Sequence, residues 1–117
     1  MRFMCLYRPD KKEGVPPSLE EMGAMGKLIE EGMKSGLLLS TEGLQPSAKG
    51  ARVRLSGGRV TVTDGPFIET KELIAGYAIM QAQSKEEAIE MAKRFIRVAG
   101  DGESEIRQLY EASDFPA

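Results

Sequence analysis

The chain has 117 residues with 16 basic and 18 acidic side chains, so its formal charge is −2, and it contains no histidine and one cysteine. These counts exclude an imidazole base, a histidine-ligated metal site and an internal disulfide. The near-neutral charge argues against nonspecific nucleic-acid binding, which needs a concentrated basic surface. No apolar run is long enough to span a membrane, and the N-terminus lacks the features of a signal peptide. We therefore expect one cytoplasmic domain over residues 1–117.

The N-terminal part of the chain predicts a strand, a helix and a second strand. Residues 3–7 are a short apolar run that ends before Pro9, which is typical of a buried strand. Ser18 and Glu21 form a capping-box pattern, and Gly36 supplies a stop, so a helix is expected between them. Three glycines lower the helix propensity of this segment, so tertiary packing must hold it. Its expected core face consists of Met22, Met25, Leu28, Ile29 and Met33. Residues 37–41 predict the second strand.

A β-hairpin is the clearest local prediction. Gly57 and Gly58 form a two-residue turn between two segments in which apolar and polar residues alternate. Counting outward from the turn pairs apolar with apolar and polar with polar residues: Leu55 with Val60, Arg54 with Thr61, Val53 with Val62, and Arg52 with Thr63. One face of the hairpin is thus basic and hydroxyl-rich, and we expect that face to lead into Asp64. A solvated surface would explain the same basic residues.

The second half of the chain predicts a turn, a strand, a second helix and a last strand. Residues 64–67 have turn chemistry, residues 68–72 are expected to be irregular, and residues 73–82 predict a mostly buried strand. A second capping-box pattern at Ser84 begins a helix that ends near Gly100, and residues 104–110 predict the final strand. This order favours an α+β, ferredoxin-like (split βαβ) fold with an inserted β-hairpin. The apolar strands leave a second sheet face that a homodimer would cover.

The run from Val62 to Glu72, with the letters VTDGPFIETKE, resembles the signature of the DGPF-domain proteins, a branch of the YCII-related family. Four further segments are also similar to this family's pattern, namely residues 42–46, 75–77, 84–95 and 105–107. The resemblance therefore covers nearly the whole chain. The resemblance implies a single YCII-related domain whose subunits dimerise into an α+β barrel around a central cavity. It also implies that function is mostly unassigned, with some members resembling small-molecule enzymes and others encoded beside sigma factors.

Asp64 is the catalytic candidate, because the family's histidine–aspartate pair has no counterpart in a chain without histidine. As a general base, Asp64 would need to reach a substrate proton. The candidate ligand-binding residues are its polar and charged neighbours: Arg52, Arg54, Thr63, Glu69, Lys71 and Glu72. The structural alternative is that Asp64 caps a turn and Phe67 fills the core. The spacing of the carboxylates matches no established ligand motif, so we predict no metal and no cofactor.

Two functional hypotheses remain open. The first is a small-molecule enzyme that uses Asp64 for proton transfer or hydrolysis in the cavity of a dimer. The second is a noncatalytic homodimeric module that binds a small polar metabolite or a protein partner, with a regulatory role. Neither hypothesis involves nucleic acid or a membrane.

Overall fold

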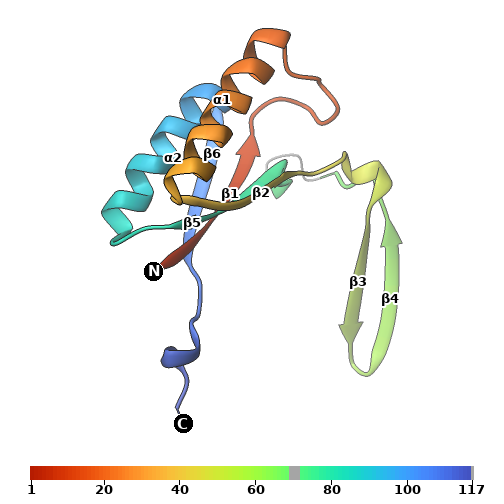
Figure 1. Cartoon of the computed structure of the whole chain (residues 1–117). Coiled ribbons are helices and arrows are strands. Elements are labelled where there is room, and N and C mark those ends of the chain that lie inside the picture. Colours follow the sequence, from red (N-terminus) through yellow and green to blue (C-terminus); the bar gives the residue numbers. More distant parts are fainter. Residues whose placement is uncertain (69–71, 117) are drawn as a thin grey trace.

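The computed structural model describes residues 1–68 and 72–116, and two helices in it lie on one side of a four-stranded antiparallel sheet (Figure 1). The sheet has the strand order β2-β5-β1-β6. Its strands are β1 (Arg2–Pro9), β2 (Leu38–Gly43), β5 (Gly76–Gln81) and β6 (Gly102–Gln108), and the helices are α1 (Leu19–Ser35) and α2 (Lys85–Ala99). This arrangement is α+β and compatible with a ferredoxin-like fold. The described strands form an open sheet and do not close into a barrel within one chain.

A separate hairpin, formed by β3 (Ala51–Ser56) and β4 (Arg59–Asp64), projects from this body (Figure 1). Its register is the one predicted from the turn outward, from Ser56 opposite Arg59 to Arg52 opposite Thr63, with one further pair between Ala51 and Asp64. Both turn glycines have positive φ, 55° and 80°, which a tight hairpin connection requires. Two short 3₁₀ helices, η1 (Ser47–Lys49) and η3 (Ala112–Asp114), complete the described elements.

The predicted helix boundaries are confirmed by the capping contacts. The Ser18 hydroxyl accepts a hydrogen bond from the Glu21 amide at 3.1 Å, and the Ser84 hydroxyl accepts one from the Glu87 amide at 3.2 Å. Gly36 follows α1 in the left-handed conformation, with φ of 78°. No helix among the described residues is both long and apolar enough to span a membrane.

The core lies between the sheet and α2. Phe3 and Cys5 of β1 pack there with Met80 of β5 and with Ala88 and Ala92 of α2. Burial raises the pKa of the Cys5 thiol, as expected for a structural cysteine.

Helix α1 differs from its predicted role, because none of its residues is buried. Met22 and Met33 of the expected core face are 49% and 45% exposed. Gly32 approaches the sheet closely, since a Cβ there would lie 2.8 Å from that of Leu38, but a Cβ at Gly23 or Gly26 would meet open space. Helix α1 therefore contacts the sheet at its C-terminal end and stands away from it elsewhere.

Candidate functional site

The Asp64–Phe67 turn packs against η1 at the base of the hairpin. The Gly65 amide donates to the Gly50 carbonyl at 3.0 Å, and the Phe67 amide donates to the Ser47 hydroxyl at 3.0 Å. A Cβ on Gly65 would overlap the Ser47 carbonyl oxygen. Only glycine fits at this position, so the turn sequence has a structural role that follows from its close backbone contact.

Ser47 joins three segments that are far apart in the sequence. Its amide donates to one carboxylate oxygen of Glu13 and its hydroxyl donates to the other, each at 2.7 Å, while the same hydroxyl accepts from Phe67. Ser47 is buried, so these bonds replace its contacts with water. The β1–α1 loop, η1 and the turn after β4 are thus held together by one serine. Nothing in the local sequence pattern around Ser47 predicts this role.

The residues predicted to form a site lie at this hairpin, but they do not converge. Asp64 is exposed, and the register pairs it with Ala51. Because strand side chains alternate, Asp64 lies on the same hairpin face as Val62, opposite to Arg52 and Arg54. The expectation that the basic face leads into Asp64 is therefore corrected.

The remaining candidates are exposed or lie outside the described residues. The Arg52 guanidinium stacks over the Phe67 ring at 3.9 Å from its centroid, which anchors the hairpin base. Arg54 and Thr63 are exposed on the polar face, and Glu72 is exposed beyond the turn. Glu69 and Lys71 lie outside the described residues. Among residues 1–68 and 72–116, no group of three or more carboxylates or thiols is arranged to hold a metal ion.

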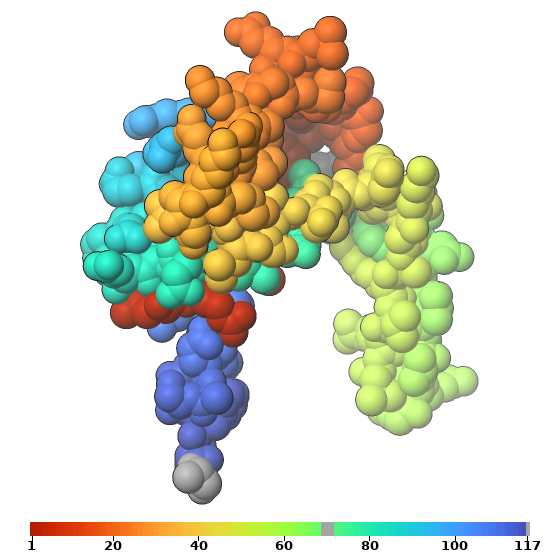
Figure 2. Space-filling model, in the orientation of Figure 1, coloured from red at the N-terminus to blue at the C-terminus, as the bar shows by residue number. Residues whose placement is uncertain are grey.

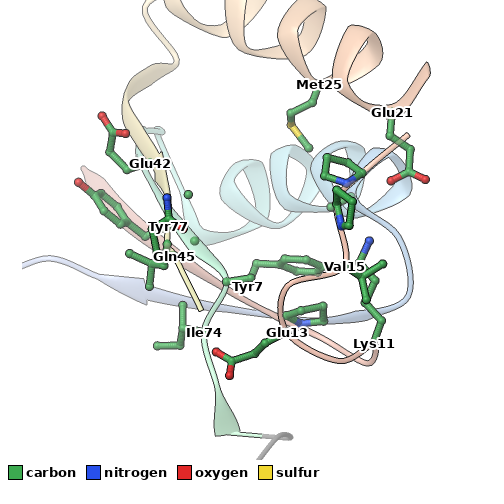
Figure 3. A pocket seen from close by; sticks show the side chains of 18 of the residues that line it. Tyr7, Lys11, Glu13, Val15, Glu21, Met25, Glu42, Gln45, Ile74 and Tyr77 are labelled. Carbon is green, nitrogen blue, oxygen red and sulfur yellow. The ribbon is translucent and has the colours of Figure 1, made fainter. Parts of the chain in front are cut away.

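A large hollow lies elsewhere, between α1, the β1–α1 loop and the sheet, with a volume of about 950 Å³ (Figure 3). Figure 3 shows the Tyr7 ring inside this hollow, with Met25 of α1 reaching toward it. Its lining is mostly apolar and includes Met25, Ile29, Leu44, Ile74, Phe95 and Val98. We call this hollow the α1 cavity. It occupies the space that the predicted core face of α1 leaves unfilled.

Tyr7 is a buried residue that lines the α1 cavity, and its hydroxyl already has partners. It donates to the Gly100 carbonyl at 2.8 Å, and the ring meets Phe95 edge-on at 5.5 Å between centroids. Burial and then the nearby charges of Asp10, Asp101 and Glu21 raise the pKa of Tyr7. The ring is therefore neutral and serves as an apolar wall.

A second hollow of about 250 Å³ lies between α1, α2 and the sheet. It shares Met25, Ile29, Thr41 and Phe95 with the α1 cavity, and Met80 and Met91 add flexible side chains to its wall. The two hollows flank the same helix. The unusual content of α1, three methionines and three glycines, was the sequence signal for this loose packing.

The fold and the hairpin base define an α+β protein with two helices on an antiparallel sheet and a glycine-dependent turn after an inserted hairpin. The YCII-related domain matches residues 1–113, so the chain belongs to the YCII-related family. It is also similar to an uncharacterized protein of Rhizobium meliloti (strain 1021), with 32% identity over 88 residues that cover 73% of this chain and 71% of the relative. The family recognised from the DGPF run is thereby confirmed.

Proposed function

We propose that the chain is a noncatalytic, homodimeric module that binds a largely apolar small molecule in the α1 cavity. The supporting observation is the hollow of about 950 Å³ beneath a helix that has no buried residue. A hollow of this size leaves the apolar side chains that line it in contact with water, and a ligand with an apolar body would cover them.

The chemistry of the cavity wall selects the ligand class. The wall is apolar, and the Tyr7 hydroxyl and the Glu13 carboxylate are already engaged in hydrogen bonds. Other polar side chains that contribute to the lining include Lys11, Glu21 and Gln45, which are labelled in Figure 3. The ligand therefore has an apolar body, and a polar group at one of its ends would face the exposed side chains of Lys11 and Glu21. This differs from the small polar metabolite that the sequence predicted beside Asp64.

Two glycines of α1 provide a matched test. A side chain at either Gly23 or Gly26 would meet open space, but only Gly26 lines the α1 cavity. With N-phenylnaphthylamine as an uncharged fluorescent probe, we expect saturable binding to the wild-type chain. Gly26→Leu should weaken it by about tenfold or more, and Gly23→Leu should leave it nearly unchanged. Absent binding, or equal binding by both variants, would contradict the proposed site.

Catalysis by Asp64 remains the second candidate function. The observation in its favour is that the Asp64 side chain is exposed and makes no hydrogen bond or ion pair within the described residues, which leaves it open to a substrate. Asp64→Asn tests this directly. If a metabolite screen finds turnover, its loss in a folded Asp64→Asn protein supports the enzyme, and unchanged turnover refutes a role for Asp64.

The homodimer is supported by the sheet face that the helices leave open. Met4 and Ile79 form a directly opposed pair on that face, and Leu6 follows on the same side of β1. All three are only partly buried in the single chain. A second subunit would cover them, and light scattering at micromolar concentration should therefore give twice the monomer mass.

A further inference from the structure

The β3–β4 hairpin presents an apolar face to solvent. Its two strands pair only with each other among the described strands, and every strand residue is exposed. Val53, Leu55, Val60 and Val62 share one face by register and are 64% to 71% exposed. An isolated two-stranded hairpin is at best marginally stable in water. A surface that covers this face would therefore stabilise the hairpin.

The single chain also exposes more surface than a compact monomer. Its accessible area is 8738 Å², against about 6,300 Å² for a folded monomer of this size. Its radius of gyration is 16.3 Å, against about 13 Å for a compact domain. The excess of roughly 2,400 Å² is what one subunit contributes to a large obligate interface. A second copy of the chain is therefore large enough to cover this surface.

The C-terminal segment, residues 109–116, follows β6 and carries an exposed aromatic pair. Tyr110 and Phe115 stack on each other at 5.1 Å between centroids, yet are 74% and 58% exposed. Figure 2 shows the hairpin and this segment as two separate projections with a gap between them. These two exposed apolar surfaces do not meet within one chain.

We propose that two copies exchange their hairpins reciprocally, so that each β3–β4 hairpin packs its apolar face on the Tyr110–Phe115 pair of the other copy. The basic side chains of the hairpin lie on its opposite face, so they remain at the outer surface of this contact. A two-fold arrangement forms this contact twice. The inference rests on the proposed homodimer and is independent of the ligand in the α1 cavity.

Adjacent residues on opposite hairpin faces give a matched pair of variants. Val62→Glu places a charge on the apolar face, and Thr61→Glu places the same charge on the polar face. By sedimentation equilibrium, Val62→Glu should raise the dimer dissociation constant by about tenfold or more relative to Thr61→Glu, and Tyr110→Ala should also raise it. Both positions lie outside the core, and circular dichroism verifies that the body stays folded.

A cross-linking experiment identifies the receiving surface directly. One tagged chain carries Leu55→Cys and a second carries Tyr110→Cys, each with Cys5→Ser, and a mixture of the two should form a disulfide between differently tagged chains. A dimer that resists Val62→Glu and forms no such disulfide overturns hairpin exchange while leaving the homodimer intact. A wild-type monomer overturns both proposals.

Discussion

Replacement of Ser47 by alanine should destabilise the base of the hairpin, because it removes a buried hydroxyl that joins three segments. The hydroxyl donates to the Glu13 carboxylate at 2.7 Å and accepts from the Phe67 amide at 3.0 Å. A bond to a charged group contributes about 1.5–3 kcal/mol and a neutral one about 0.5–1.5 kcal/mol. The expected loss is therefore about 2–4 kcal/mol, with the Ser47 amide still bonded to Glu13.

Urea unfolding followed by circular dichroism measures the global effect of Ser47→Ala, and hydrogen exchange at the Phe67 and Gly65 amides measures the local one. Ser56→Ala is the matched control, because Ser56 is an exposed hairpin residue and its loss should change the free energy of unfolding by less than about 0.5 kcal/mol. If Ser47→Ala changes neither unfolding nor amide protection more than Ser56→Ala does, Ser47 does not hold these segments together.

Three further predictions concern single residues. Gly65→Ala should speed amide exchange at the hairpin base, because its Cβ would overlap the backbone of η1. Gly26→Ala should instead stabilise α1 by up to about 1 kcal/mol in urea unfolding, because its Cβ would meet open space. If the two variants changed amide exchange and the free energy of unfolding equally, the close contact at Gly65 would be refuted. Cys5 should react with a maleimide only after unfolding, because burial raises its pKa and blocks access; rapid native labelling would contradict this. The hydrogen bond from Arg2 lowers the pKa of Glu111 below 4.5, so the stability it adds is present above that pH and lost as pH falls through the lowered pKa. Arg2→Gln should therefore flatten acid unfolding below pH 4.5, and an unchanged pH profile would refute this.

Much of the local structure could be predicted because it depends on neighbouring residues. Ser18 and Ser84 cap their helices through bonds to amides three residues away. The hairpin register follows from the Gly57–Gly58 turn and the alternation on either side of it. The strand order that relates β1 to its neighbours also agreed with the ferredoxin-like expectation.

The candidate site was less predictable, because it depends on contacts between distant segments. Asp64 was expected beside the basic face of the hairpin, but strand alternation places it on the opposite, apolar face. Ser47 could not be identified, since its partners Glu13 and Phe67 lie 34 and 20 residues away. Tyr7 belongs to the strand predicted over residues 3–7, but the hollow around it depends on the distant helix α1 and was not predicted.

The sequence by itself determined the elements, their caps, the hairpin register and the family, because these follow from short-range patterns that each segment carries. The tertiary structure alone decided how those elements are placed relative to one another. Helix α1 has a clear apolar stripe, yet its distance from the sheet turns that stripe into a cavity wall. The hairpin has an apolar face, yet it projects from the body. Periodicity shows which side chains share a face, but only packing shows what that face meets.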